Sequence, residues 1–339
     1  MPIREKTLNV VLFGASVSAQ SKDDSYWKKM KLWEGQHNLA NDTLVNISRL
    51  TFPSAYFSNA GLLSLSNLIA LKPDVVILDW LSTEEQDCAA EIISFVFQKL
   101  VKKGVSVLTT AMVRLDTWER VTPQYEAFLE CSVFFEQPFI DFVQLAKNNN
   151  LSWEDVTRDG VHTNEVGADL YSKYIIEYVK SALNAGSFPS VVREQVSGDL
   201  ARVGITEYSN SISTLNLYEE VTVDNDLTME ITLYSSDYST AQIWAPQVVG
   251  PETEEVEWSV FQKGDLKLQG KDCLKDEWCH FYRQAYKPVV RSLDGVEPGI
   301  SFVKINVNKL HERSELRMLD KLDCINCCVM KYELVKKNA

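Results

Sequence analysis

Three polar residues, Ser16, Asp159 and His162, have types and spacing that suit acyl transfer. Ser16 follows an apolar run and Gly14 in the sequence NVVLFGASVSAQ, whereas Asp159 and His162 are separated by two residues in DGVHTNEVGADLY. A serine becomes a useful nucleophile when an imidazole accepts its proton, and the imidazole acts best when a carboxylate fixes its tautomer. The three residues are therefore candidates for nucleophile, general base and orienting carboxylate.

The element before Ser16 is predicted to be a buried strand. The stretch Leu8–Gly14 is short and apolar, and Gly14 permits a sharp turn directly before the serine. A helix that begins at this turn offers backbone N–H groups to an anion. We therefore expect Ser16 to serve both as nucleophile and as an oxyanion donor.

His162 precedes a predicted helix over residues 163–183. Thr163 can cap this helix, and Asp159 and His162 then lie in the loop before it, where both side chains can face one cleft. The apolar face of the helix is predicted from residues at helical spacing. These residues are Val166, Leu170, Tyr174 and Tyr178.

The first half of the chain alternates strand-like and helix-like segments. PDVVILDW at 73–80 and GVSVLTT at 104–110 are short apolar runs, which predict two more buried strands. Between them, residues 82–104 predict a helix in which Ser82 and Glu85 have capping-box spacing. This alternation indicates an α/β fold with a parallel sheet and helices on both faces.

The sequence changes character after Leu183. The turn-rich segment NAGSFPS favours a domain boundary here, dividing the chain into residues 1–187 and 188–339. The second part contains short strand-like segments separated by Asp, Gly and Pro turns, which predict an antiparallel β-sandwich. The segments are LTMEITLYSS, EVEWSVFQK, ISFVKINVN and CCVMKYELV.

The apolar strand, Gly-x-Ser and the distant Asp-x-x-His before a terminal helix resemble the SGNH or GDSL hydrolase family over about residues 7–184. Members have a flavodoxin-like three-layer α/β/α fold and act as esterases, lipases, carbohydrate deacetylases or O-acetyltransferases. The resemblance implies that Ser16 is the nucleophile, His162 the general base and Asp159 its orienting carboxylate. It extends over the first domain and implies no cofactor.

The two inner motifs of the family are altered in this chain. In the family an asparagine is followed five positions later by a glycine whose N–H joins the oxyanion hole; here Asn59 is followed by Ser64. The third motif usually ends in GTND, and Thr83 stands where its asparagine donates to the oxyanion. A threonine hydroxyl can donate one hydrogen bond, although losing such a donor can cost on the order of a hundredfold in rate.

Each candidate also has a purely structural interpretation. Ser16 could be only the cap of the first helix, and Ser18 competes with it as nucleophile. Ser82 and Thr83 are explained by the capping box without any chemistry, and Asn59 by a turn. The Asp-x-x-His context favours catalysis at Ser16 over capping.

The seven cysteines raise two questions, metal binding and redox compartment. Cys273 and Cys279, with Cys324 and Cys327, could hold a structural zinc ion, but the gap between the first two is wider than zinc knuckles use. Burial as small strand residues is the alternative. An odd number of cysteines does not fit a fully disulfide-paired secreted protein, so we expect a cytoplasmic location.

Charge and hydropathy exclude several classes of partner. The formal net charge of −13 argues against nucleic acid and anionic membranes, because both attract clustered Lys and Arg. No apolar run reaches the roughly 18 residues of a transmembrane helix. A secretory leader is disfavoured because Glu5 and Asn9 interrupt the pattern at the amino terminus.

The sequence thus predicts an SGNH-type serine esterase or O-acyltransferase. Its substrate is expected to be a small-molecule or glycan acyl ester, foremost an O-acetyl group of a sugar or polysaccharide, with an acetyl donor as a further partner for a transferase. The alternative is a degenerate hydrolase domain that binds carbohydrate or protein without catalysis. The altered inner motifs favour this alternative, whereas Ser16, Asp159 and His162 oppose it.

Overall fold

The structure, a computed structural model, describes most of the first half of the chain and part of the second. The described residues are 7–82 without 42, 54 and 63, then 90–185, 218–222, 228–233, 240–249, 255–273, 283–290, 295–297, 299–305 and 327–333. The chain divides into two compact units, Met1–Thr214 and Leu215–Ala339.

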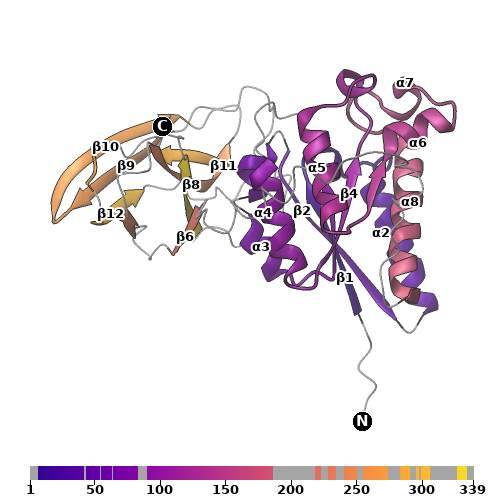
Figure 1. The fold of residues 1–339 in the computed structure, drawn as a ribbon, viewed down its shortest axis with the longest axis horizontal. Helices are drawn as coiled ribbons and strands as arrows, with labels where there is room; N and C mark the ends of the chain where they lie inside the picture. Colours follow the sequence, from indigo (N-terminus) through magenta and orange to yellow (C-terminus); the bar gives the residue numbers. More distant parts are fainter. Residues whose placement is uncertain are drawn as a thin grey trace, which may run out of the picture. The chain divides into compact units, whose positions relative to one another are not determined.

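A five-stranded parallel sheet forms the centre of the first unit (Figure 1). The strand order β2-β1-β3-β4-β5 is that of flavodoxin-like folds, in which ligands bind beyond the carboxyl ends of the strands where the order reverses, here between β1 and β3. The strands are β1 (Thr7–Gly14), β2 (Leu44–Thr51), β3 (Val75–Asp79), β4 (Ser106–Ala111) and β5 (Phe139–Asp141).

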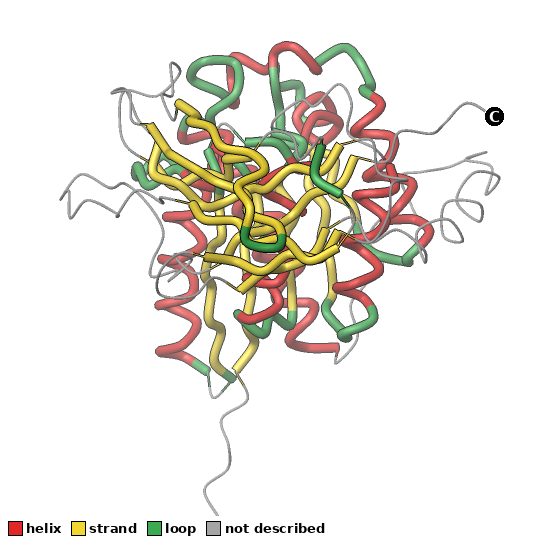
Figure 2. Tube along the Cα trace, turned by 90° about the vertical axis from the view of Figure 1, so that its left-hand side faces the viewer, coloured by secondary structure: helices red, strands yellow, loops and turns green. Residues whose placement is uncertain are grey.

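Helices cover both faces of this sheet, as Figures 1 and 2 show. One layer contains α2 (Tyr26–Ala40), α6 (Phe142–Asn148), α7 (Trp153–Val156) and α8 (Glu165–Ala185). The other contains α3 (Leu65–Ala70), α4 (Ala90–Val101) and α5 (Pro123–Phe134). Short helical segments at Ser16–Ala19 (α1), Phe57–Gly61 and Leu115–Thr117 complete the connections. The three-layer α/β/α fold is confirmed.

The strands are apolar because both of their faces are buried. Val10 and Leu12 of β1 join the core under α2 and α8, whereas alternate residues such as Phe13 point to the other face. There Phe13 packs edge-on against Trp80, with ring centroids 5.2 Å apart. The predicted strands at 8–14, 73–80 and 104–110 are therefore confirmed with small changes of boundary.

The predicted terminal helix is confirmed, but its cap and its buried face differ from the prediction. Asn164, not Thr163, accepts a hydrogen bond in the first turn, from the Gly167 N–H at 3.0 Å. The residues of α8 in the core are Ala168, Tyr171, Ile175, Tyr178, Val179 and Ala182, while Val166 is exposed. The predicted helix at 82–104 is observed from Ala90. Of its predicted capping box, Glu85 lies outside the described residues, and the Ser82 hydroxyl donates to the Asp79 carbonyl at 3.2 Å.

The second unit consists of antiparallel strands, as predicted. Two four-stranded sheets have the orders β10-β9-β12-β7 and β11-β8-β13-β6, and β11 contacts β9 and β10 of the other sheet. The strands are β6 (Tyr218–Thr222), β7 (Thr228–Leu233), β8 (Thr240–Val249), β9 (Glu255–Gln262), β10 (Asp265–Cys273), β11 (Arg283–Val290), β12 (Gly299–Ile305) and β13 (Cys327–Glu333).

The predicted domain boundary after residue 187 falls in a segment outside the described residues. Helix α8 ends at Ala185 and β6 begins at Tyr218, so the described elements fall on either side of this segment. The position of the boundary within 186–217 stays a prediction.

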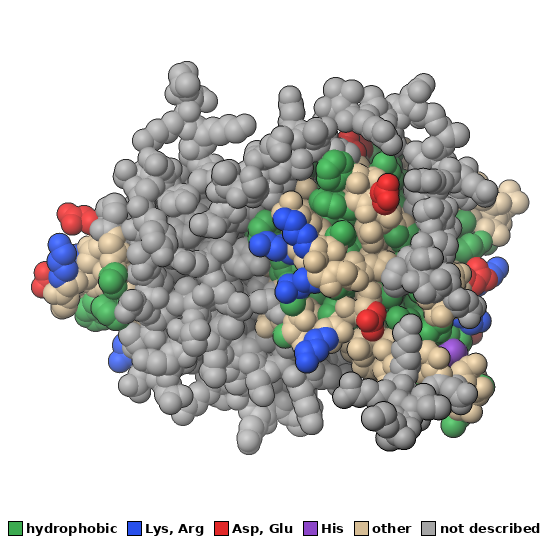
Figure 3. Space-filling model, turned by 60° about the horizontal axis from the view of Figure 1, so that its bottom comes forward, with side chains coloured by type: hydrophobic (Ala, Val, Ile, Leu, Met, Phe, Trp, Pro, Cys, Tyr) green, Lys and Arg blue, Asp and Glu red, His purple; other side chains and the backbone are tan. Residues whose placement is uncertain are grey.

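One face of the molecule carries side chains of both charges. On the face in Figure 3, Lys and Arg side chains are interspersed with hydrophobic, acidic and uncharged ones. Within the described part of the chain, no helix is both long and apolar enough to cross a membrane.

Gly14 offers a test of how closely β1 and β3 approach each other. A Cβ atom on Gly14 would lie 2.5 Å from the Asp79 carbonyl oxygen, so Gly14→Ala should lower the free energy of unfolding by about 1–3 kcal/mol through overpacking. Gly35→Ala is the matched control: Gly35 is exposed in helix α2 with nothing within 4 Å of the added atom, and the change should stabilise by about 0.5–1 kcal/mol. Urea unfolding followed by tryptophan fluorescence measures both; equal effects would contradict the close approach.

Candidate active site

Ser16 is the first residue of α1, directly beyond the carboxyl end of β1. Ala15 is the N-cap residue and no side chain caps this helix, so Ser16 is not a cap and its half-buried hydroxyl is available for other roles. As the first helical residue, Ser16 also has an N–H group without an intrahelical acceptor. Arg49 of β2 fixes the other end of α1 by donating to the carbonyls of Ala19 (3.1 Å) and Gln20 (3.0 Å).

Asp159 and His162 form a hydrogen-bonded pair in the loop between α7 and α8. The His162 Nδ1 and Asp159 Oδ2 atoms are 2.8 Å apart, and Asp159 Oδ1 accepts hydrogen bonds from the backbone N–H groups of His162 (2.7 Å) and Val161 (3.1 Å). When Nδ1 donates to the carboxylate, the neutral imidazole keeps Nε2 as its acceptor. This is the tautomer that a general base needs.

The Asp159 carboxylate is stabilised in its ionised form. Partial burial opposes ionisation, but the hydrogen bonds from the His162 N–H and ring and from the Val161 N–H outweigh it and hold the pKa of Asp159 below its ordinary value. The side chains remain accessible, with 31% of His162 and 47% of Asp159 exposed. The Asp159 carboxylate is therefore ionised, and both side chains are accessible to solvent.

The loop that carries this pair is held in place by its own backbone. Thr157 and Thr163 form a β-bridge, the Arg158 N–H donates to the His162 carbonyl at 2.9 Å, and Gly160 adopts a positive φ of 82°. The Gly160 carbonyl accepts from the Leu115 N–H at 2.7 Å, which ties the loop to the segment after β4. Its shape is thus set before any substrate arrives.

The same loop is joined to the segment that follows α1. The Thr163 hydroxyl donates to the Asp24 carbonyl at 3.0 Å, and Arg158 lies 3.4 Å from the Asp24 carboxylate. These contacts bring Asp159 and His162 to the same edge of the sheet as Ser16, although about 140 residues separate them. No hydrogen bond joins the described side chains of Ser16 and His162 in this structure, and catalytic hydrogen bonds are often long without substrate. The triad stays a prediction.

The predicted oxyanion donors beyond Ser16 receive little support. Ser64 is buried, and both its N–H (3.1 Å) and its hydroxyl donate to the Ala60 carbonyl, which disfavours it as an oxyanion donor. Asn59 lies in the π-helical segment, and its side chain is outside the described residues, as is the whole of Thr83. The Ser16 N–H stays a predicted oxyanion donor.

Ser18 is not a competing nucleophile. Its side chain is fully buried, and its hydroxyl bonds the Asp79 carboxylate at 2.5 Å and the Tyr26 hydroxyl at 2.6 Å. Sequence reasoning missed Asp79, the last residue of β3. The signal was an acid placed directly after the four apolar residues of PDVVILDW.

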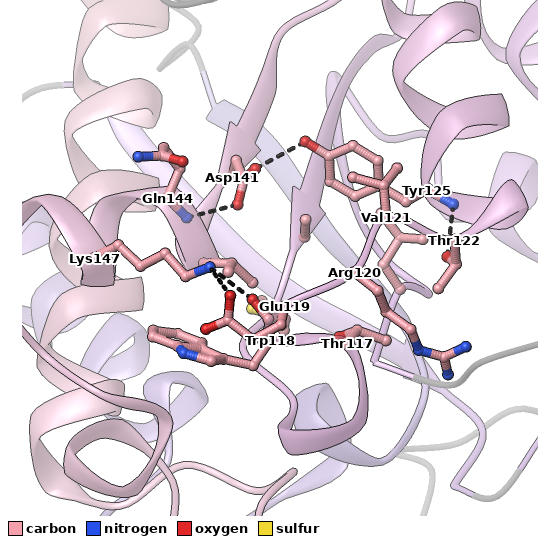
Figure 4. A pocket seen from close by; sticks show the side chains of 14 residues that line it. Thr117, Trp118, Glu119, Arg120, Val121, Thr122, Tyr125, Asp141, Gln144 and Lys147 are labelled. Atoms are coloured by element: carbon pink, nitrogen blue, oxygen red, sulfur yellow. Dashed lines mark hydrogen bonds and ion pairs between the residues drawn. The ribbon is translucent and has the colours of Figure 1, made fainter.

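A cavity of about 190 Å³ lies beside this edge, beyond β4 and β5 (Figure 4). Its polar groups pair with one another: Tyr125 donates to Asp141 at 2.8 Å, and Lys147 donates to the Trp118 carbonyl at 2.8 Å and lies 3.4 Å from Glu119. Ser16 and His162 do not line it, and ligand pockets usually measure about 300–1,000 Å³. The cavity is therefore not lined by the predicted catalytic residues.

The predicted zinc ligands cannot be placed. Cys279 and Cys324 lie outside the described residues, and of Cys273 and Cys327 only the backbone is described. Among the described side chains, no group of three His, Cys, Asp or Glu residues is arranged to hold a metal ion.

Comparison with solved structures identifies the same two-unit fold in an esterase. A two-domain esterase (CEX) active on acetylated mannans is 11% identical, with a TM-score of 0.53 over 97% of this chain and 92% of that one. The same esterase co-crystallised with mannopentaose aligns equally well, over 98% of this chain. An acetyl xylan esterase is 18% identical and covers 51% of this chain with a TM-score of 0.42. No protein-family model and no curated protein sequence matches the chain.

The lowered pKa of Asp159 predicts how stability depends on pH. A carboxyl group whose pKa is lowered by folding stabilises the protein above its unfolded pKa of about 3.9, and this contribution is lost as the pH falls through the folded value. The difference in free energy of unfolding between wild type and Asp159→Asn should therefore shrink as the pH falls below about 4. Urea unfolding at each pH measures it, and a difference that stays the same or grows below pH 4 would contradict the assignment.

Proposed function

We propose that the chain is a serine esterase or O-acyltransferase that acts on an acyl ester, foremost the O-acetyl group of a sugar or polysaccharide. The observation that carries this proposal is the 2.8 Å hydrogen bond between His162 Nδ1 and Asp159, in a loop tied to the segment after Ser16. A histidine held by a carboxylate can act as a general base for a nearby nucleophile. Ser16 lies at the carboxyl edge of the sheet, where ligands bind in this fold.

The reaction is a double displacement. Ser16 Oγ attacks the acyl carbonyl carbon while His162 Nε2 takes the hydroxyl proton, and the Ser16 N–H donates to the oxyanion. The ester C–O bond then breaks, the departing sugar oxygen takes the proton from His162, and the acyl group stays on Ser16. Water or another sugar hydroxyl attacks the acyl-enzyme, giving its proton to His162, which returns it to Ser16.

Asp159 acts on His162 throughout this cycle. Its carboxylate is ionised at neutral pH, so it stabilises the imidazolium that forms each time His162 accepts a proton. Two backbone N–H groups hold the carboxylate on its other oxygen, so the histidine ring and its partner are oriented as one unit.

The proposed substrate class rests on the two-unit architecture. The esterase that shares it over nearly the whole chain is active on acetylated mannans, which supports an acetylated glycan as substrate here. The accompanying antiparallel unit is proposed to bind carbohydrate. The odd number of cysteines supports the cytoplasm as the site of action.

A non-catalytic binding protein is the second candidate. It is favoured by one observation, that both hydrogen-bond donors of Ser64 are used within the protein. A domain that has lost part of its oxyanion hole retains the shape of the sheet edge without the rate enhancement.

The test compares wild type with Ser16→Ala. Turnover of p-nitrophenyl acetate and release of acetate from acetylated mannan should fall at least about a thousandfold, because the nucleophile is removed. Asp159→Asn should lower kcat by on the order of a hundred- to ten-thousandfold, because His162 loses the partner that fixes its tautomer. A serine-directed phosphonate, located by mass spectrometry, should label Ser16.

The matched control is Ser181→Ala, which removes a half-buried hydroxyl on α8 that donates to the Glu177 carbonyl at 3.0 Å. It should leave turnover unchanged. Activity that survives in Ser16→Ala, or a label on another residue, would contradict the assignment. A wild type with neither turnover nor label supports the binding protein, whereas acetate appearing on an added sugar acceptor supports the transferase.

A further inference from the structure

A buried carboxyl group lies directly beneath the turn that carries Ser16. The Asp79 side chain is fully buried, and its Oδ2 atom accepts hydrogen bonds from the Ser18 hydroxyl at 2.5 Å and the Tyr26 hydroxyl at 3.2 Å. The two hydroxyls also bond each other at 2.6 Å. The mechanism above leaves this cluster without a role, although a buried carboxyl is costly to keep.

Asp79 also contacts the turn through its main chain. The Ala15 N–H donates to the Asp79 carbonyl at 3.1 Å, and Gly14 pairs with Asp79 across β1 and β3. Asp79 therefore contacts the chain on both sides of Ser16: its carbonyl binds Ala15, and its side chain binds Ser18. Gly14 leaves space for these two contacts because it has no Cβ atom. A Cβ atom at this position would lie 2.8 Å from the Ser18 hydroxyl.

We infer that Asp79 is a positioning residue for acyl transfer, which fixes the direction of the Ser16 hydroxyl by holding Ala15 and Ser18 on either side of it. The inference rests on the function proposed above. Asp79 is buried and does not reach the substrate, so its effect passes through the turn. A misplacement of the nucleophile by about 1 Å can cost on the order of a hundredfold in rate.

The charge of the Asp79 carboxyl group changes with pH, so a positioning role predicts a pH dependence of kcat that a purely packing role does not. Burial raises the pKa of Asp79 to about 7, against the opposing effect of the hydrogen bonds from Ser18, Ser82 and Tyr26. The titratable groups that face it are Tyr26 from α2 and Tyr171 from α8; burial raises the pKa of both hydroxyls, so they are neutral at pH 7. Asp79 is therefore the group of this cluster whose charge changes near pH 7.

Ionisation of Asp79 strengthens the hydrogen bond that its side chain accepts from Ser18, in the turn that carries Ser16. A carboxylate accepts a stronger hydrogen bond from Ser18 than a neutral carboxyl group does. We expect kcat to rise as the pH increases through about 7. Stability should change in the opposite direction: because folding raises the pKa of Asp79, its contribution is present below the unfolded pKa of about 3.9 and is lost as the pH rises to about 7.

The test is Asp79→Asn in the full chain, assayed for kcat and KM with p-nitrophenyl acetate from pH 5.5 to 8.5. We expect kcat at pH 8 to fall about ten- to a hundredfold with KM within twofold, and the rise of kcat near pH 7 to disappear. The melting temperature of the variant should rise relative to that of wild type as the pH increases from 5 to 7.

Asp74→Asn is the matched control. Asp74 lies just before the other end of β3 and bonds the β1 backbone at the Asn9 N–H (2.8 Å), so the same chemical change is made at the edge away from Ser16. It should leave kcat, KM and the pH profile unchanged. A folded Asp79→Asn protein that keeps the wild-type kcat and pH profile overturns the inference.

If Asp79→Asn does not fold, Ser18→Ala tests the positioning role of Asp79. Removing the Ser18 hydroxyl takes away a hydrogen bond that favours the ionised carboxyl group, so kcat should fall and the midpoint near pH 7 should move upward. An unchanged midpoint overturns the inference. A wild type without turnover and without phosphonate label at Ser16 overturns the proposed function together with this inference, whereas an active wild type with unaffected variants overturns the inference alone.

Discussion

The close approach of β1 and β3 at their carboxyl ends is the constraint on which the rest of the site depends. Gly14 lies so near Asp79 that an added Cβ atom would be 2.5 Å from the Asp79 carbonyl oxygen. This contact sets where the chain leaves the sheet, and therefore where Ser16 begins α1. It also closes a buried cluster of Asp79, Ser18 and Tyr26 beneath the serine. A parallel sheet provides such an edge because all of its strands end on one side.

The second half of the site is built differently. Asp159 and His162 lie in a loop whose conformation is fixed by local hydrogen bonds, with the carboxylate accepting two backbone N–H groups and the histidine ring. The loop is then tied to Asp24, beyond α1, and to Leu115, beyond β4. A rigid sheet edge thus carries the serine, while a self-supporting loop carries the base, and long-range contacts join the two.

Much of the fold could be predicted from local sequence. The strands at 7–14, 75–79 and 106–111 are mainly apolar because the sheet is covered on both faces, and such runs are easy to recognise. Local sequence does not predict the edge strand β2, because LVNISRLT mixes polar residues into the pattern, or β5, because it has three residues. The capping residue of α8 was misplaced by one position, since Thr163 and Asn164 are both suitable and the Thr163 hydroxyl is used by Asp24 instead.

The sequence by itself determined the types and the order of the reactive groups: a serine after an apolar strand, and an aspartate three positions before a histidine. The hydrogen bond between the last two follows from short-range geometry, which explains why their spacing was informative. Only the tertiary structure decided which other residues support them. Ser64 has its donors occupied by Ala60, and Asp79 became part of the site because β3 lies beside β1. Strand order is set by the packing of the whole sheet, and no local pattern encodes which buried acid will lie beneath the serine.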